Sequence, residues 1–462
     1  MNNAWFLQDL MSVIADRGRT FLPASLFGAD PELGLQDLAN ALMAGRGEAS
    51  SVAIAQQLLR HYEILEDDRQ RSAFFRYIAE RFQPNEEIAV DRAEAYIANP
   101  GRDTLQALQK AIESPQQEFI RRLNLAPNGT AAIVHMREDL LRLDLANPAL
   151  RSLDRDIIHL LQSWFNRGFL VLQRIDWQTP ALILDRIIDY EAVHEITGWE
   201  DLKRRLHPAD RRCFAFFHPS LVDEPLIFVE VALMNEVPST IADVLQEKPK
   251  GTSEPEMRVP PTVAVFYSIS NCQAGLRGIS FGNFLIKQVV EELAREHPSL
   301  KTFVTLSPVP RFARWLAEAD LDGEAAALRD QLVVEADAPE AASIAAVDAD
   351  DVATLESLAA RYFMTERRPD GHVIDPVARF HLGNGARLER INVNGDLSVK
   401  GLRESHGVMV NYLYEPREIE RNHEQFVNDG TVAASKGVRA LVKGQAAADA
   451  ARAIASDLPK AS

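Results

Sequence analysis

Residues 263–295 of the chain read VAVFYSISNCQAGLRGISFGNFLIKQVVEELAR. The first eight form a short apolar run rich in β-branched and aromatic residues, which predicts a buried strand over 263–270. From Phe281 onward, apolar residues recur at helical spacing, so an amphipathic helix is predicted to follow. Small residues occur before and at the start of this helix, at Gly275, Gly278, Ser280 and Gly282. Because the first backbone N–H groups of a helix are unpaired and lie at the positive end of its dipole, the turn is a candidate pyrophosphate site.

Two commoner phosphate-binding motifs are absent from the sequence. It contains no Gly-x-x-x-x-Gly-Lys-Ser/Thr P-loop and no Gly-x-Gly-x-x-Gly dinucleotide fingerprint. The turn 277–282, Arg-Gly-Ile-Ser-Phe-Gly, instead resembles the Arg/Gln-x-x-Gly-x-Gly/Ala signature with which GNAT-type acetyltransferases hold the pyrophosphate of coenzyme A. Ser280 stands where that signature usually has its middle glycine. The alternative interpretation is a glycine-rich connection between a strand and a helix, without a ligand.

Composition limits the function classes. The 462 residues are 46% hydrophobic, enough for two to four domains with substantial cores. A formal charge of −17 argues against nucleic acid and anionic membrane surfaces as partners. Two cysteines, Cys213 and Cys272, indicate a reducing compartment without a disulfide framework. No apolar run reaches the length of a membrane span and no secretory signal is evident, so we expect a cytoplasmic protein.

The first third of the chain is predicted to be an all-α helical bundle. Apolar residues recur at helical spacing from Leu58 to Ile112, and prolines separate the segments. No acidic or histidine set has metal-binding spacing there, so packing or an oligomer contact is the expected role, and we expect a homo-oligomer (dimer or tetramer). We assign 1–112 to this domain, with a boundary that could extend to about 166, and 113–462 to the catalytic domain. Helices over 137–145 and 154–165 and a first strand at 169–172 are expected near the boundary.

The remainder of the chain has a mixed pattern, so the fold class is α+β. Strands are expected at 213–217, 226–234, 263–270, 302–306, 387–393 and 406–414, and helices at 310–360 and 431–455. Consecutive strands without intervening helices indicate antiparallel pairing. Only 263–270 and 302–306, which have a helix between them, are expected to pair in parallel. This is the element order of a GNAT core.

Several segments, taken in order, resemble the malonyl-CoA decarboxylase family over roughly residues 160 to 440. They are HPS at 218–220, EPL at 224–226, FYSIS at 266–270, LSPVP at 306–310, RFHLGNGA at 379–386 and NYLY at 411–414. The resemblance implies a helical N-terminal domain followed by a GNAT-like mixed β-sheet domain flanked by helices. It implies decarboxylation of malonyl-CoA to acetyl-CoA and CO2, a reaction of fatty acid metabolism. Coenzyme A is then part of the substrate, and no permanently bound cofactor and no metal are expected.

The resemblance places two residues at the centre of the reaction. His381 matches the family's catalytic histidine, and an imidazole can hand a proton to the α-carbon of the thioester enolate. Without the resemblance, a lone histidine beside a turn is more often structural. Ser253, in the long connection 235–261, matches the catalytic serine, with Ser268 or Ser270 as fallbacks. It would either hydrogen-bond the substrate carboxylate, which we favour, or act as a nucleophile.

Glu224 and Tyr414 match the remaining active-site positions. Glu224 could orient His381, and the phenol of Tyr414 could donate to the carboxylate or to the thioester. A backbone N–H near 269–271 is expected to bind the thioester carbonyl. The predicted contacts to coenzyme A are Ser270, Asn271, Arg277, Gly278, Ile279, Ser280, Phe281 and Gly282. Arg311 and Arg314 are weaker candidates for contacts to coenzyme A. The basic residues at 203–205 and 211–212 could meet the 3′-phosphate or face solvent.

Two other function classes stay open at this point. GNAT-type acyl transfer from coenzyme A to an amine needs a base and an acceptor groove, and an acidic groove beside Glu224 would favour it. A non-catalytic acyl-CoA-binding scaffold would have no turnover to lose when His381 is replaced.

Overall fold

The computed structural model describes residues 31–44, 47–143, 147–245, 259–279, 284–336 and 346–443. Two compact units divide the chain. The first comprises 1–171 together with 216–226 and 271–281, and the second comprises 172–215, 227–270 and 282–462. Within the described ranges no helix is both long and apolar enough to cross a membrane.

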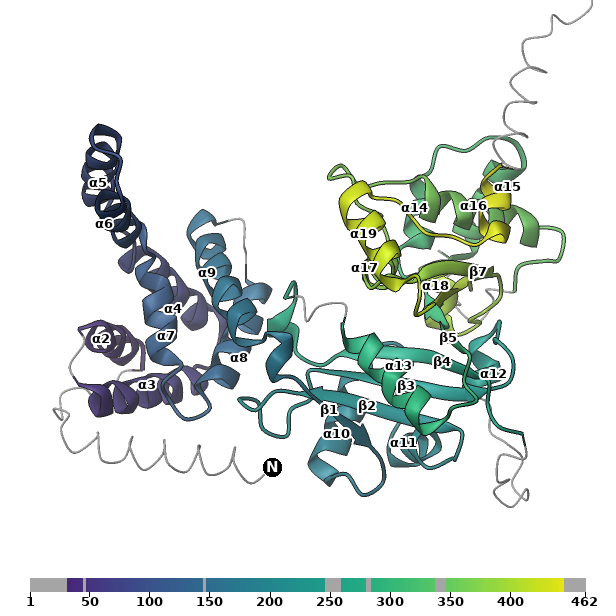
Figure 1. Ribbon diagram of the computed structural model, residues 1–462, viewed down its shortest axis with the longest axis horizontal. Coiled ribbons are helices and arrows are strands. Elements are labelled where there is room, and N and C mark those ends of the chain that lie inside the picture. The colour runs from purple at the N-terminus through teal and green to yellow at the C-terminus, as the bar shows by residue number, and fades with distance from the viewer. Residues whose placement is uncertain are drawn as a thin grey trace, which may run out of the picture. The chain divides into compact units, whose positions relative to one another are not determined.

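Helices make up most of the first unit (Figure 1). They are α2 (Pro31–Met43), α3 (Glu48–Glu63), α4 (Asp68–Arg81), α5 (Glu86–Ala98), α6 (Arg102–Ile112), α7 (Pro115–Leu123), α8 (Gly129–Arg142) and α9 (Pro148–Trp164). Asp67, Asn85 and Asn147 begin α4, α5 and α9 by accepting hydrogen bonds from backbone N–H groups of the first turn. The helical first third that the sequence predicts is confirmed.

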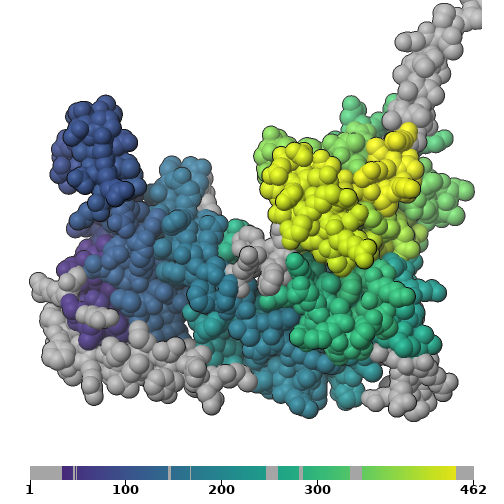
Figure 2. Space-filling model, in the orientation of Figure 1, coloured from purple at the N-terminus to yellow at the C-terminus, as the bar shows by residue number. Residues whose placement is uncertain are grey.

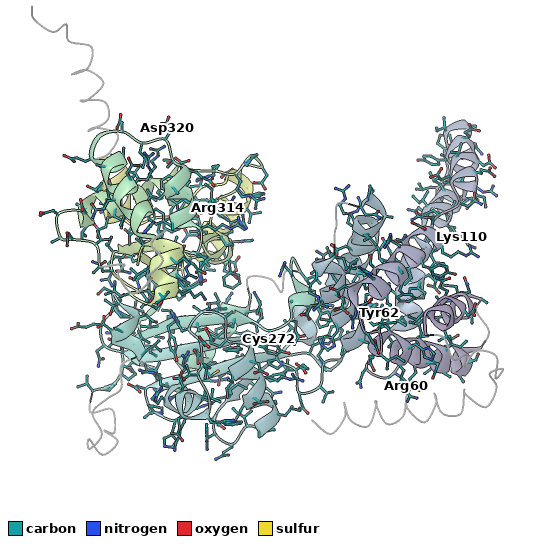
Figure 3. The ribbon with its side chains drawn as sticks, turned by 180° about the vertical axis from the view of Figure 1, so that it is seen from behind. Arg60, Tyr62, Lys110, Cys272, Arg314 and Asp320 are labelled. Carbon is teal, nitrogen blue, oxygen red and sulfur yellow. The ribbon has the colours of Figure 1, made fainter. Side chains whose placement is uncertain are left out.

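The core of this unit is apolar and aromatic. Phe74, Phe75 and Phe119 are buried, with Phe82 stacked on Phe119 at 5.3 Å between ring centroids. Tyr62 packs beside Phe74 and Phe75 and donates a hydrogen bond to Asp139 of α8. Burial, with the Asp139 charge, raises the pKa of the Tyr62 phenol, so Tyr62 remains a neutral donor. Tyr62 is labelled among the helices of the bundle in Figure 3.

The hairpin of α5 and α6 stands apart from this core. Neither helix buries a residue, and the hairpin projects from its unit in Figure 2. Its exposed apolar side chains are Ile88, Val90, Ile97, Leu105 and Ile112. Lys110 lies on the same hairpin (Figure 3). These apolar side chains form an uncovered surface on the chain as described.

The second unit is built on a mixed sheet, which has eight strands among the described residues. They are β1 (Val171–Ile175), β2 (Arg211–Phe217), β3 (Ile227–Met234), β4 (Val263–Asn271), β5 (Thr302–Thr305), β6 (Ser307–Pro308), β7 (Arg387–Asn392) and β8 (Met409–Leu413). Their order is β1-β2-β3-β4-β5-β8-β6, and β7 also pairs with β8. Ends of β1, β2 and β4 belong to the first unit.

Pairing follows the prediction. Hydrogen bonds Leu226 N to Phe216 O and Leu233 N to Asp210 O run antiparallel between the β2 and β3 segments. The pair β4–β5 is parallel, from Val263 opposite Thr302 to Phe266 opposite Thr305. The helix α13 (Phe284–Glu296) connects these two strands. The α+β class and the GNAT-like mixed sheet with flanking helices are therefore confirmed.

Strands β4 and β5 diverge after a short parallel contact. Leu306 N still donates to Phe266 O. Beyond this bond β4 continues to Asn271, whereas the segment after β5 turns into β6, which pairs with β8. In the described residues no β4–β5 register pair follows Phe266. Backbone groups of 267–271 are thereby released from this partner, at the carboxyl end of the parallel pair.

Helices cover the sheet and carry the connections of the second unit (Figure 1). Besides α13 they are α10 (Ala181–Tyr190), α11 (Trp199–Leu206), α12 (Ile241–Leu245), α14 (Phe312–Glu318), α15 (Gly323–Ala336), α16 (Val352–Met364), α17 (Pro376–Gly383), α18 (Val399–Ser405) and α19 (Ile419–Asp429). Two predicted strand starts are wrong. A 3₁₀ turn occupies Arg167–Phe169, so β1 begins at Val171, and His406 ends α18 in the left-handed conformation, so β8 begins at Met409. The predicted helix 431–455 lies partly outside the described residues; its described part is helical from 436 to 443.

Candidate active site

His381 lies in the short helix α17, and hydrogen bonds fix both ends of this helix. Asp375 caps the first turn, where its Oδ1 accepts hydrogen bonds from Val377 N and Ala378 N, both at 2.9 Å. Pro376 is the first helical residue, a position where its missing N–H costs nothing. At the other end Ala386 N donates to the His381 carbonyl at 3.0 Å, across the left-handed Gly385. The imidazole therefore projects from a short helix with two fixed ends.

The imidazole of His381 has a polar partner on each nitrogen. Nδ1 lies 2.8 Å from the Tyr414 hydroxyl, and Nε2 lies 3.3 Å from Ser307 Oγ. The ring stacks on Tyr412, with 4.6 Å between centroids and 21° between planes. Only 3% of His381 is exposed. Strand β8 thus supplies the stacking ring, and Tyr414 follows directly after that strand.

A chain of hydroxyl groups continues from Ser307. Its Oγ donates to Thr305 Oγ1 at 2.8 Å, and Thr305 Oγ1 also accepts from Tyr412 N at 3.1 Å. Because Ser307 donates its one proton to Thr305, it can only accept from the imidazole. We therefore assign the Nε2–H tautomer to His381, with Nδ1 accepting from Tyr414. The 3.3 Å contact at Nε2 is the weaker of the two, so Nε2 is the nitrogen more easily redirected to a substrate.

Burial controls the charge of this site. Loss of hydration lowers the pKa of His381 from 6.5 to about 3 and raises the pKa of Tyr414 above its usual value. Near neutral pH the ring is uncharged and the phenol keeps its proton. Burial also raises the pKa of Asp375, the cap of α17, to about 6, against the backbone N–H groups that favour its charged form. A negative charge brought next to His381 would raise its pKa and favour proton uptake.

We expect His381 not to titrate between pH 5 and 8 in the substrate-free protein. Its folded pKa lies below the unfolded value, so the unfolded chain takes up this proton first as the pH falls. The stability that the neutral imidazole provides is complete above about pH 6.5 and is lost as the pH falls toward 3. Histidine ¹⁵N NMR, with His381→Asn to assign the signal, measures this. A midpoint near 6.5 for His381 would contradict the buried neutral ring.

The predicted coenzyme A turn is described only in part. Arg277, Gly278 and Ile279 follow the 3₁₀ turn Ala274–Leu276, and Gly278 has φ +81°. A Cβ at Gly278 would have no protein atom within 4 Å among those described. Ser280, Phe281 and Gly282 lie outside the described residues, as does Ser253, so their predicted roles stay predictions.

Ser268 and Ser270 of β4, the predicted alternatives to Ser253, are both hydrogen-bonded to Glu191. Ser268 Oγ lies within 2.9 Å of both carboxylate oxygens of Glu191, and Ser270 Oγ donates to Glu191 Oε2 at 3.2 Å. Both serines are buried, whereas Asn271 at the end of β4 is exposed. The hydroxyl groups of Ser268 and Ser270 thus both donate hydrogen bonds to the carboxylate of Glu191. These hydroxyls are engaged, and the predicted contact of the thioester with a backbone N–H of 269–271 stays a prediction.

Glu224 lies in the connection between β2 and β3. Its Oε2 accepts a hydrogen bond from Gln273 Nε2 at 3.4 Å, and Gln273 also donates to Pro225 O at 3.2 Å. Glu224 is therefore linked to the segment that leads into the coenzyme A turn, within the first unit. His381 belongs to the second unit, so the predicted orientation of His381 by Glu224 stays a prediction.

Sequence reasoning missed Ser307, which contacts His381, and Thr305, which accepts a hydrogen bond from Ser307. The segment LSPVP at 306–310 contributes to the family resemblance, but Ser307 and His381 are 74 residues apart. Only the pairing of β6 with β8, Ser307 opposite Val410, brings this hydroxyl to the imidazole. A serine directly after a parallel strand was the signal available, and it is a weak one.

The basic residues are mostly engaged in ion pairs. Arg205 is buried against Glu230, and Arg212 pairs with Glu296 at 2.6 Å. Arg314 is exposed and pairs with Glu318 on the same helix. Among the described residues no group of three or more His, Cys, Asp or Glu side chains could hold a metal ion.

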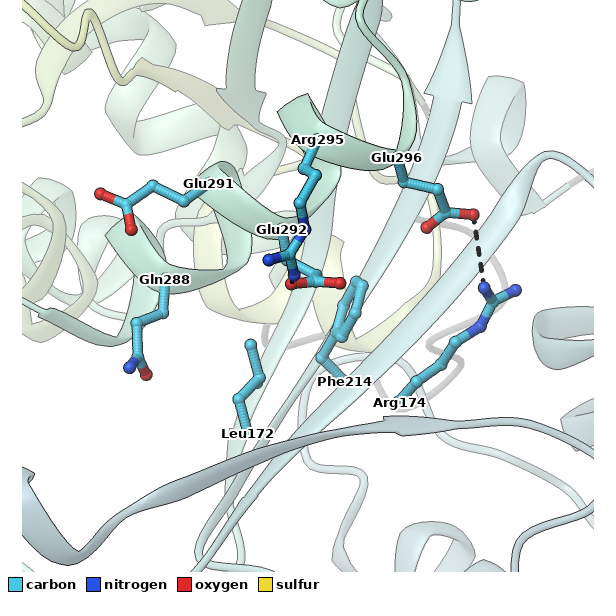
Figure 4. Close-up of a pocket in the computed structure, with 8 residues that line it drawn as sticks. All are labelled: Leu172, Arg174, Phe214, Gln288, Glu291, Glu292, Arg295 and Glu296. Atoms are coloured by element: carbon cyan, nitrogen blue, oxygen red, sulfur yellow. Dashed lines mark hydrogen bonds and ion pairs between the residues drawn. The ribbon is translucent and has the colours of Figure 1, made fainter.

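A polar pocket lies beside the last turns of α13 (Figure 4). Its lining residues are Leu172, Arg174, Phe214, Gln288, Glu291, Glu292, Arg295 and Glu296. Arg174 Nη1 lies 3.3 Å from Glu296 Oε1 across it. Three carboxylates against two guanidinium groups disfavour a phosphate, and the pocket is at the C-terminal half of α13, where the helix dipole is negative. This pocket does not fit the predicted coenzyme A site.

The fold and the buried histidine define an α+β protein with a helical N-terminal region and a GNAT-like sheet. The family model of the malonyl-CoA decarboxylase C-terminal domain matches residues 168–452, and that of the N-terminal domain matches 82–165. The chain belongs to the malonyl-CoA decarboxylase family.

Individual relatives agree with this assignment. The chain is 33% identical over 360 residues to the mitochondrial malonyl-CoA decarboxylase of Rattus norvegicus, with 72% of each chain covered. Crystal structures of malonyl-CoA decarboxylases from Rhodopseudomonas palustris and Agrobacterium vitis are 50% and 52% identical to it. Each match has a TM-score of 0.79 and covers 88% of this chain and 99% of the other.

Proposed function

We propose that the chain decarboxylates malonyl-CoA to acetyl-CoA and CO2. The observation that carries the proposal is a buried, neutral His381 held between Tyr414 and Ser307, in a chain of this family. In the reaction, the bond between the α-carbon and the carboxylate breaks, and its electron pair forms the thioester enolate as CO2 leaves. One proton must then reach the α-carbon. Water exclusion favours the first step, because it removes solvation from the carboxylate.

His381 delivers that proton in our proposal. The malonyl carboxylate brings a negative charge to a site where burial alone keeps the imidazole neutral. Substrate binding therefore raises the pKa of His381 and couples proton uptake to occupancy. After loss of CO2 the charge lies on the enolate, and the imidazolium transfers its proton to carbon. Tyr414 keeps the ring oriented through Nδ1.

The remaining predicted residues have supporting roles in this proposal. Ser253 hydrogen-bonds the malonyl carboxylate, since decarboxylation requires no acyl-enzyme. Glu224 orients His381, and a backbone N–H of 269–271 binds the thioester oxygen as it becomes negative. The divergence of β4 and β5 after Phe266 in the described residues supports the last assignment.

Coenzyme A is held as part of the substrate, with its pyrophosphate at the turn 277–282. We expect Gly278→Ala to raise the KM for malonyl-CoA by roughly tenfold. No described protein atom fills the space that the added methyl group would take, and in our proposal the pyrophosphate lies there. Substrate kinetics on the variant measure the change.

Gly371→Ala is the matched control for this variant. Gly371 has φ +82° and, like Gly278, no described protein atom within 4 Å of an added Cβ. Both substitutions should cost about 1–2 kcal/mol of stability for the left-handed backbone. An equal KM for malonyl-CoA in the two variants would contradict the proposal that the pyrophosphate binds at this turn.

Incubation of the pure protein with malonyl-CoA alone, followed by mass analysis of the thioesters, tests the function. We expect acetyl-CoA to accumulate without an acceptor. Turnover that depends on an added amine would instead indicate acyl transfer, and unchanged malonyl-CoA would indicate a binding scaffold.

We further propose a cytoplasmic homo-oligomer (dimer or tetramer) that acts in fatty acid metabolism. The exposed apolar side chains of the α5–α6 hairpin support association, which light scattering measures. Cys213 and Cys272 are buried and form no disulfide in the part of the chain that the structure describes, which fits a reducing compartment. The curated rat relative is named as mitochondrial, so cell fractionation is the direct test of location.

A further inference from the structure

One buried side chain of the N-terminal helices contacts the start of the predicted coenzyme A turn, and both belong to the first unit. Arg137 of α8 is only 2% exposed. Its Nη1 donates to two carbonyl oxygens, Gly275 O at 2.6 Å and Arg277 O at 2.8 Å. Its Nε donates to Asp154 Oδ1 of α9 at 2.8 Å. Two helices from the N-terminal region thus fix a turn that lies about 140 residues later in the sequence.

Backbone packing reinforces the same contact. A Cβ at Gly275 would overlap the carbonyl of Val134, one turn before Arg137 in α8. Only glycine therefore lets the turn approach the helix this closely. On its other side the segment is tied to the β2–β3 connection, through Cys272 N to Leu226 O and through Gln273.

We infer that Arg137 is a positioning residue for coenzyme A, and that the helical region sets substrate affinity through it. The inference rests on the proposed function, since it takes the turn 277–282 as the pyrophosphate seat. The two hydrogen bonds fix the carbonyls of Gly275 and Arg277, and with them the path of the backbone as it enters the proposed pyrophosphate seat. A guanidinium held by a carboxylate and two carbonyls has a fixed orientation, which a lysine ammonium cannot reproduce.

Arg137→Lys tests the inference. We expect the Kd for coenzyme A, measured by calorimetry, to rise by roughly tenfold, about the effect of one misplaced charge-assisted hydrogen bond. The KM for malonyl-CoA should rise in parallel, with little change in kcat. Malonyl-pantetheine lacks the pyrophosphate, so its KM should be the same for the variant and the parent protein. General destabilisation would not produce this difference between the two substrates.

Arg122→Lys is the matched control. In α7, Arg122 Nε donates to Glu118, and Nη1 donates to the carbonyls of Leu42 and Met43. The set of partners is the same, a carboxylate and two carbonyls, but none of them belongs to the turn. Arg122→Lys should leave coenzyme A affinity unchanged. Equal affinity in Arg137→Lys and Arg122→Lys would overturn the inference.

Asp154→Asn decides the question if Arg137→Lys does not fold. The amide removes the charge that orients the guanidinium but leaves both carbonyl contacts possible, so we expect a several-fold rise in the Kd. An unchanged Kd would overturn the inference. If the parent protein binds coenzyme A without turnover, the decarboxylase proposal fails while this inference is still measured by binding. If the parent protein does not bind coenzyme A, both fail.

Discussion

Replacing His381 with asparagine is expected to lower the turnover of malonyl-CoA by about 10²–10⁴-fold, the usual contribution of a positioned acid or base. The amide can occupy the space between Tyr414 and Ser307, but it cannot take up and release a proton near neutral pH. Coenzyme A affinity should persist, because the turn at 277–279 is formed by other residues. Steady-state turnover and calorimetric binding, measured on the same preparation, separate the two effects.

His372→Asn provides the control for this variant. His372 is exposed and follows α16 by eight residues, in a connection that no proposed role involves. It should retain full turnover and an unchanged unfolding midpoint. Turnover by His381→Asn close to that of His372→Asn would exclude the imidazole from the mechanism and favour a proton that comes directly from water.

The strands at the centre of the site could be predicted because their information is local. The run 263–270 and its parallel partner at 302–306 are β-rich and bounded by turn residues, and the structure places both within a residue or so of the prediction. The start of β8 could not be predicted in the same way. His406 continues the apparent alternation in the sequence, but φ +50° makes it the end of α18.

The polar contacts of His381 depend on tertiary structure and not on the local sequence. Tyr414 came from the family resemblance, whereas Ser307 depends on which strand lies beside β8. No local pattern encodes a contact across 74 residues. The role of the helical region was missed for the same reason. Arg137 looks like an ordinary charged residue of an amphipathic helix until the turn at 275–277 is seen beside it.

The largest effect on stability is expected at the end of the helix that carries the histidine. Gly385 has φ +79°, and a Cβ there would overlap the carbonyl of Ile419 at the start of α19. Gly385→Ala should therefore combine the cost of a left-handed alanine with that of overpacking, about 3 kcal/mol or more in total. Urea unfolding of the variant measures this loss.

Gly371→Ala separates the two costs, because its backbone is equally left-handed and its Cβ would meet no described atom. It should lose only about 1–2 kcal/mol. In Gly385→Ala the displaced turn also weakens the bond from Ala386 N to the His381 carbonyl, so turnover should fall even at temperatures where the protein stays folded. Gly371→Ala should keep its turnover. If the two variants lose equal stability and equal activity, the close approach of Gly385 to α19 does not position the imidazole, and the short contact at Ile419 has no role in the site.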